Sequence, residues 1–245
     1  LDPMTFDAPS LSFSHAVAAP RRPHRVAFAA TIGGSPVDQE TENICRDSMR
    51  HFKNVGSKVE EIAIDLENLE DTFLALRSQE FVIDRELQLQ RYRDQIKPDI
   101  IWNTELGLEQ SISTLAKAER ARAALYAQFN DLFLRYDLIV TPGANTPAFD
   151  VELRFPEAIN GIKLEHYMAA STLTAAVTIS ASPALSLPCG FDQYGRPIGL
   201  QLIGRPRGEA ALLAAGALFE VESGLAEQVP IDPRHGKVPP IGKLT

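Results

Sequence analysis

The sequence has 245 residues, and its 24 Lys and Arg against 32 Asp and Glu give a formal net charge of −8. This acidic balance argues against nucleic acid as a partner, and the absence of an apolar run of roughly 18 residues argues against a membrane partner. The two cysteines, Cys45 and Cys189, have no Cys-x-x-Cys partner, so the sequence predicts a cytoplasmic protein with no disulfide framework, metal or cofactor.

The N-terminal part predicts an extended connection followed by a β-α-β unit. Residues 1–24 are rich in Pro, Ser and Ala without a sustained period, which indicates a connection lying over a surface. Residues 25–30 are a short apolar run typical of a buried strand, and residues 58–64 alternate as a second strand. A helix is predicted between them, from Asp38 to about Asn54. Two strands joined through a helix are expected to lie parallel.

The middle of the chain predicts two long helices. Residues 66–89 and 113–135 carry apolar side chains at helical spacing with charged residues between them, and Pro98 is expected to break the helical pattern after the first. Residues 138–140 are a short apolar strand, and residues 144–165 have the turn residues of a loop. The strands over residues 26–30 and 138–140 are apolar on both sides, so we expect them to need cover that a partner or a missing segment supplies.

The C-terminal part predicts an antiparallel pair. Residues 185–187 and 198–203 are strands that flank the turn Asp192–Gly195, which is a hairpin signal. Pro183 and Pro188 are expected to limit the first strand to four residues, because proline cannot join the interior of a hydrogen-bonded ladder.

Small residues over 167–182 and a helix over 208–222 complete the prediction. The alternation of strands and helices indicates an α/β fold with a mixed, mostly parallel β-sheet flanked by helices. We expect one domain over residues 25–232 and a Pro-rich tail over residues 233–245.

Three stretches in a fixed order are more specific than the fold class. They are Phe-Leu-Arg-Tyr-Asp-Leu-Ile-Val-Thr-Pro at 133–142, Ser-Pro-Ala-Leu-Ser-Leu-Pro-Cys-Gly-Phe at 182–191 and Gly-Arg-Pro-Ile-Gly-Leu-Gln-Leu-Ile-Gly at 195–204. Together they resemble the C-terminal half of the amidase-signature family, over roughly residues 2–232. The resemblance implies part of the amidase-signature fold and a hydrolase of carboxamide C–N bonds.

The chemistry of that family implies which residues this chain lacks. A Ser attacks the amide carbonyl, a second Ser in a cis peptide relays protons, a Lys acts as base, and a Gly-rich loop supplies the oxyanion hole. The Gly-Gly-Ser-Ser-Gly-Gly-like core of that loop is absent, and Gly33-Gly34-Ser35 does not match it because Pro36 follows. No catalytic residue is therefore assigned. We expect a truncated fragment that supplies scaffold and pocket wall and is inactive alone.

Four residues are the candidates for that wall, as the resemblance implies: Thr141, Pro142, Asn145 and Thr178. Another constellation can be assembled from Ser180, His166 and Asp150, but the Gly-x-Ser-x-Gly turn of such hydrolases is missing. Cys189 stands in an apolar setting and is expected to be a small buried side chain.

Three functions remain open. The first is an amidase of a small carboxamide, with that amide as substrate of the full-length protein and a homo-oligomer as an assembly to test. The second is the glutamine-amide-hydrolysing subunit of a tRNA-dependent amidotransferase, which is disfavoured because Ala170-Ser171-Thr172 has no acidic residue to hold the glutamine amino group. The third is a non-catalytic, stand-alone binding module.

Overall fold

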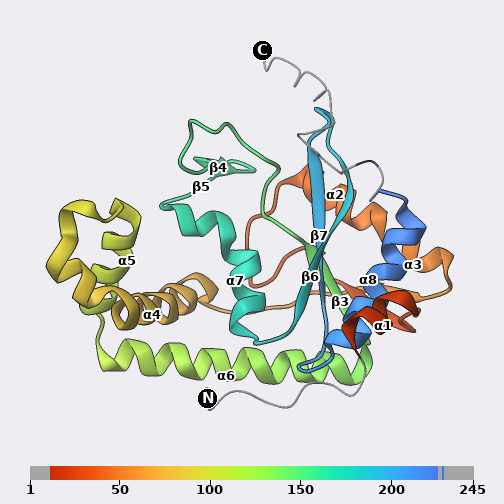
Figure 1. The fold of residues 1–245 in the computed structure, drawn as a ribbon, viewed down its shortest axis with the longest axis horizontal. Coiled ribbons are helices and arrows are strands. Elements are labelled where there is room, and N and C mark those ends of the chain that lie inside the picture. The colour runs from red at the N-terminus through yellow and green to blue at the C-terminus, as the bar shows by residue number, and fades with distance from the viewer. Residues whose placement is uncertain (1–11, 226–227, 229–245) are drawn as a thin grey trace.

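A five-stranded mixed sheet forms the centre of the computed structural model, which describes residues 12–225 and residue 228 (Figure 1). In spatial order its strands are β2 (Lys58–Glu61), β1 (Arg25–Phe28), β3 (Leu138–Pro142), β7 (Pro197–Ile203) and β6 (Ala184–Phe191). A separate two-stranded hairpin, β4 (Ala158–Ile159) and β5 (Ile162–Lys163), lies within the segment expected to be a loop.

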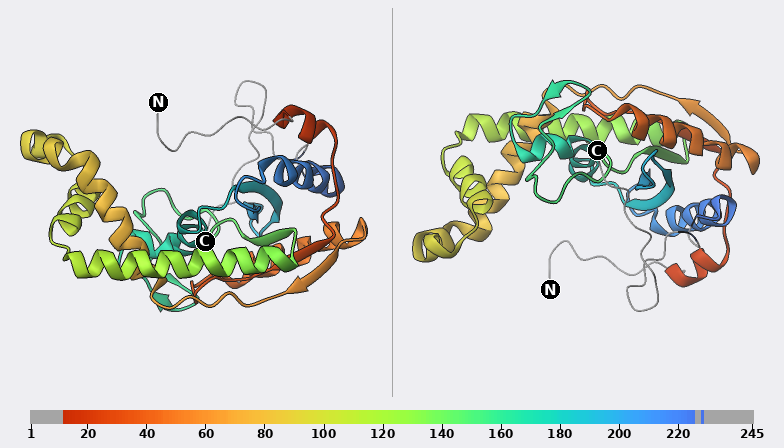
Figure 2. Two further views of the ribbon diagram at one scale, coloured as in Figure 1. Left: turned by 90° about the horizontal axis from the view of Figure 1, so that it is seen from below. Right: turned by 90° about the horizontal axis from the view of Figure 1, so that it is seen from above.

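Helices cover both faces of the sheet. They are α1 (Phe13–Ala18), α2 (Gln39–Ser48), α3 (Arg50–Asn54), α4 (Leu69–Tyr92), α5 (Pro98–Leu108), α6 (Ile112–Arg135), α7 (Thr172–Ile179) and α8 (Glu209–Ser223), with short 3₁₀ turns η1 (Arg93–Gln95) and η2 (Tyr167–Ser171). The outer part of α4 and α5 projects away from the sheet at one end of the molecule (Figures 1 and 2). Within the part of the chain that the structure describes, none of these helices is both long and apolar enough to cross a bilayer.

The sheet combines parallel and antiparallel pairings. Strand β1 pairs in parallel with β2 and β3, whereas β7 pairs antiparallel with β3 and β6. The predicted α/β class with a mixed sheet flanked by helices is confirmed. The sheet is not mostly parallel, however, since two of its four strand pairings are antiparallel. These are the pairing within the β6–β7 hairpin and the pairing of β7 with β3.

The chain itself covers both faces of its central strands. Val26 and Phe28 of β1 lie in a core with α2, α3 and α8, whereas Ala27 lies in a second core with α6 and α7. Strand β3 alternates in the same way, with Ile139 in the second core. The expectation that these two strands need cover from outside the chain is therefore wrong, since α2, α3 and α8 cover one face and α6 and α7 cover the other.

The C-terminal hairpin is antiparallel, as predicted, but its first strand is longer than four residues. In its register Leu185 lies opposite Leu202, and Leu187 lies opposite Leu200. The strand does not end at Pro188, because a register shift between Pro188 and Gly190 carries the pairing onward to Phe191. Strand β6 lies at the edge of the sheet, where one side of the strand needs no ladder partner and proline is tolerated.

The helices differ from the expectation in three places, and the helix expected from Asp38 to about Asn54 is divided at Met49 into α2 and α3. Residues 1–24 are not wholly extended, because Ser12 accepts a hydrogen bond from the amide of His15 and starts α1, which packs on α8. Pro98 begins a further helix that was not predicted, because it lies in the first turn of α5, where proline is favoured. The predicted tail at 233–245 and residues 1–11 lie outside the described residues.

A glycine sets the close approach of α4 and α5. A Cβ on Gly107 would collide with the carbonyl oxygen of Ser78 and with Val82 of α4. Alanine normally stabilises a helix interior relative to glycine. Gly107→Ala is nevertheless expected to destabilise the chain by about 1–3 kcal/mol, because the backbone must move apart. A urea titration measures this change.

Gly216 of α8 is the matched control. A Cβ there would meet the end of the flexible Leu185 side chain rather than backbone. Gly216→Ala should therefore cost less than Gly107→Ala. Equal costs for the two variants would show that the α4–α5 approach is not the constraint at Gly107.

Candidate functional site

A cavity of about 500 Å³ lies where the loop after β3 meets η2 and the start of β7. We call it the candidate cavity, and we call residues 144–156 the wall loop. Most of the lining is apolar or aromatic, and it includes Pro147, Phe149, Phe155, Pro156, Tyr167 and Ile198. A lining of this kind with a few polar groups is typical of small-molecule sites.

Asn145 lines the candidate cavity and carries a buried acceptor without a partner in the described part of the chain. The residue is 1% exposed, and its Nδ2 donates to the carbonyl oxygen of Pro36 at 2.7 Å. Its own carbonyl oxygen accepts from the amide of Asp38 at 2.8 Å. Its Oδ1 is buried without a hydrogen-bond partner among the described residues. A buried acceptor is costly when unpaired, so this atom makes the wall beside the cavity less stable than a fully hydrogen-bonded one.

The other three predicted wall residues lie in different places. Thr141 and Pro142 end β3 directly before the wall loop, and the Thr141 hydroxyl donates to the carbonyl of Pro142 at 3.1 Å. Thr178 lies on α7, exposed, and lines a separate cavity of about 670 Å³ between α4, α6 and α7. The structure thus brings Asn145 to the candidate cavity, places Thr141 and Pro142 beside it, and puts Thr178 elsewhere.

The Ser/His/Asp constellation does not assemble. The Ser180 hydroxyl is buried and donates to the carbonyl of Val177 at 2.7 Å. His166 Nε2 lies 2.8 Å from Glu70 Oε1, and Asp150 accepts from the amide of Glu152 in its own loop. Each of the three side chains therefore has a local partner.

Aromatic contacts connect the wall loop and η2 to α5. The ring of Trp102 lies against His166 and Tyr167, and the Tyr167 hydroxyl accepts from Asn103 Nδ2 at 2.7 Å. Arg154 of the wall loop forms an ion pair with Asp99 of α5. These contacts fix the C-terminal end of the wall loop. No local pattern in the sequence predicts them.

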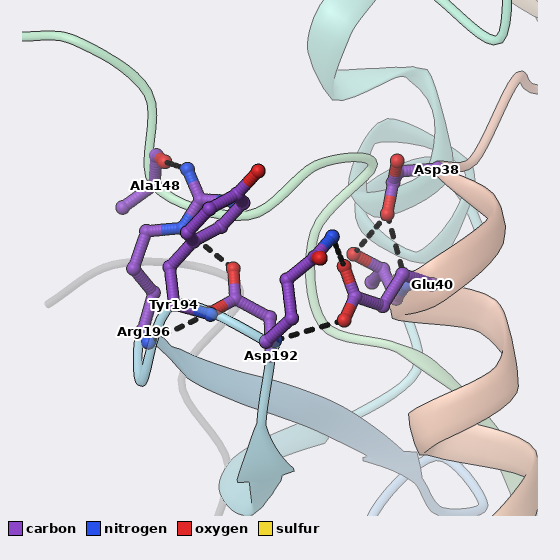
Figure 3. Close-up of polar contacts among 8 residues, drawn as sticks. Asp38, Glu40, Ala148, Asp192, Tyr194 and Arg196 are labelled. Carbon is purple, nitrogen blue, oxygen red and sulfur yellow. Dashed lines mark hydrogen bonds and ion pairs between the residues drawn. The ribbon is translucent and has the colours of Figure 1, made fainter. Parts of the chain in front are cut away.

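The turn of the β6–β7 hairpin is hydrogen-bonded to the wall loop (Figure 3). Arg196 Nη1 donates to the carbonyl oxygen of Ala148 at 2.6 Å, and its Nε donates to Asp192 Oδ2 at 2.5 Å. Burial by itself would raise the pKa of Asp192. Hydrogen bonds from the backbone and side chain of Arg196 and from the Tyr194 amide outweigh it and hold that pKa below its usual value.

The two cysteines are core residues. Cys45 and Cys189 are both buried, with their Sγ atoms 3.6 Å apart. The contact with Cys189, together with burial, raises the pKa of the Cys45 thiol, so it stays protonated. Among the described residues, no group of three or more His, Cys, Asp and Glu side chains could hold a metal ion.

Comparisons with known sequences point to one family. A family model described as Amidase matches residues 2–213. A glutamyl-tRNA(Gln) amidotransferase subunit of Streptococcus thermophilus (strain CNRZ 1066) is 27% identical over 243 residues, covering 84% of this chain and 46% of that protein. The corresponding subunit of Levilactobacillus brevis (strain ATCC 367) is 31% identical over 217 residues, covering 87% and 38%. The chain spans less than half the length of these curated relatives.

Solved structures share the fold. A bacterial aryl acylamidase of the amidase-signature family matches with a TM-score of 0.80 and 22% identity, over 92% of this chain and 49% of that one. A 6-aminohexanoate cyclic dimer hydrolase complexed with substrate matches with a TM-score of 0.73 and 15% identity, over 91% and 50%. At these identities the likeness shows the fold alone.

Proposed function

The chain belongs to the amidase family, that is, the amidase-signature hydrolases, and on this basis we propose that it forms the pocket-wall portion of an enzyme that hydrolyses carboxamide C–N bonds. In this proposal a Ser–cis-Ser–Lys centre carries out the acyl transfer. The sequence contains no Gly-Gly-Ser-Ser-Gly-Gly-like segment to hold such a centre. Turnover therefore requires that segment in addition to the residues of this chain.

The proposed class of substrate depends on which residues line the candidate cavity. Phe149, Phe155 and Tyr167 give it aromatic walls, and no Asp or Glu is among its described lining residues. Its charged lining residue, Arg154, is paired with Asp99. We propose a small amide with an aryl or other apolar group as the substrate.

A component of a tRNA-dependent amidotransferase is the second candidate, because the curated relatives carry that name. It would imply a protein partner and a glutamine substrate. A glutamine amino group is cationic and needs a carboxylate beside it. The lining residues Ala170 and Ser171 supply none, which favours the neutral, apolar amide.

A binding titration with acetanilide tests the proposal. Phe149 lines the candidate cavity and is 46% exposed, so Phe149→Ala should leave the fold intact and weaken acetanilide binding about tenfold through lost apolar contact. Val151 lies in the same wall loop, is 90% exposed and does not line the cavity, so Val151→Ala is the matched control. Glutamine should bind more weakly than acetanilide.

Equal binding by the two variants, or stronger binding of glutamine, would contradict the proposed substrate class. The same preparations should not hydrolyse acetanilide, because the nucleophile and base together account for several orders of magnitude in rate. Turnover that a serine-directed inhibitor abolishes would show that this chain holds a catalytic site of its own.

A further inference from the structure

We propose that Arg196 is a positioning residue that fixes the wall loop and so determines how well the candidate cavity accepts its ligand. This inference rests on the proposed function only for the identity of that ligand. Arg196 itself is not among the residues that line the cavity. It acts through the carbonyl oxygen of Ala148, a residue that does line it.

The geometry makes Arg196 a bridge between two segments that are far apart in the sequence. Its Nη1 donates to Ala148 in the wall loop at 2.6 Å, and its Nε donates to Asp192 in the hairpin turn at 2.5 Å (Figure 3). The guanidinium also lies 5.1 Å from the centre of the Tyr194 ring. A planar guanidinium can serve an acceptor on each side at once, which an ammonium group cannot do in the same geometry.

The hairpin side of this bridge is rigid. The Asp192 side chain is fully buried, and its Oδ1 accepts the amides of Tyr194 at 3.0 Å and Arg196 at 2.8 Å. Gly195 adopts the left-handed conformation, with φ of 77°, that closes the turn. The Arg196 side chain is therefore oriented before it meets the wall loop, and holding Ala148 costs little further conformational entropy.

The wall loop needs such an anchor at its middle. Asn145 fixes its start through Pro36 and Asp38, and Arg154 fixes its end through Asp99. The hydrogen bonds within Asp150–Leu153 are local and reach no other element. The bond from Arg196 links the intervening stretch to the sheet.

The residues that follow Arg196 increase its effect on the cavity. Pro197, Ile198 and Gly199 of β7 line the candidate cavity directly after it in the chain. One side chain therefore joins the wall loop to the strand that carries another part of the lining. Releasing the loop should lower ligand affinity by loss of preorganisation, without removing any lining atom.

Three variants of the chain test this role. Arg196→Met keeps the apolar length of the side chain without its donors, and Arg196→Lys keeps a donor for one of the two acceptors. Glu40→Gln is the matched control, because Glu40 of α2 accepts from Gln193 in the same hairpin turn but does not touch the wall loop. Amide hydrogen exchange over residues 146–152 is measured first, followed by acetanilide affinity.

Arg196→Met should speed exchange in that stretch about tenfold or more, the scale of one lost charge-assisted hydrogen bond, and weaken acetanilide binding. Arg196→Lys should fall between it and the unmodified chain, and Glu40→Gln should leave both readouts unchanged. If Arg196→Met does not fold, the positioning role is tested by comparing amide exchange and acetanilide affinity between Arg196→Lys and Glu40→Gln.

The two readouts separate the two proposals. Unchanged exchange over residues 146–152 in both Arg196 variants overturns the positioning role, whatever binds. Faster exchange in a chain that never binds acetanilide overturns the proposed substrate class and leaves the positioning of the wall loop supported.

Discussion

Leu200→Ala is expected to lower the free energy of unfolding by about 2–5 kcal/mol. Leu200 is 0% exposed in β7, between β3 and β6, opposite Pro142 on one side and Leu187 on the other. It belongs to the core that joins these strands to α8 through residues such as Phe219. Strands on both sides prevent the backbone from closing over the lost volume, so a cavity remains and adds to the loss of buried apolar surface.

A urea titration of the purified chain measures this loss. Leu134→Ala on α6 is the control, because Leu134 is 80% exposed and its truncation should change stability by less than about 0.5 kcal/mol. Similar effects of the two substitutions would mean that β7 is not the buried strand that the structure describes.

Asp192→Asn is expected to cost about 2 kcal/mol at neutral pH, the scale of a hydrogen bond to a charged group. Asparagine can keep one oxygen for the amides of Tyr194 and Arg196. It cannot keep the charged acceptor for Arg196 Nε, and its amide nitrogen would face that donor from a fully buried position. The Asp192 pair should therefore contribute more than an exposed ion pair does.

The pH dependence of this cost follows from the lowered pKa of Asp192. A carboxyl whose pKa is lower in the folded than in the unfolded chain contributes stability above its usual pKa and loses it as pH falls through the folded value. The gap between the original chain and Asp192→Asn should therefore be full at pH 7 and shrink below about pH 4.

Titrations in urea across this pH range check the prediction, with Asp131→Asn on the exposed side of α6 as control. That variant should follow the original chain within about 0.5 kcal/mol at every pH. A gap that widens as the solution is acidified would contradict the expected sign.

The sequence alone determined the elements whose signals are local. Alternating apolar residues assign Leu185 and Leu187, and likewise Leu200 and Leu202, to the buried face of two neighbouring strands, because period two places every second side chain on one face of the sheet. The order of motifs around residues 133–204 identifies the family that the model over residues 2–213 matches. The resemblance that these motifs carry also implied Asn145 as a wall candidate.

The tertiary structure alone decided which distant residues share a site. Thr178 and Asn145 are both candidates for one wall by sequence, yet packing of α7 against α4 and α6 places Thr178 in another cavity. Arg196 and Ala148 lie 48 positions apart, and no periodicity of either segment records the hydrogen bond between them. A periodic pattern reports which face of its own element is buried. The partner of that face depends on how the elements pack, and a polar bridge between two loops follows only from their final positions.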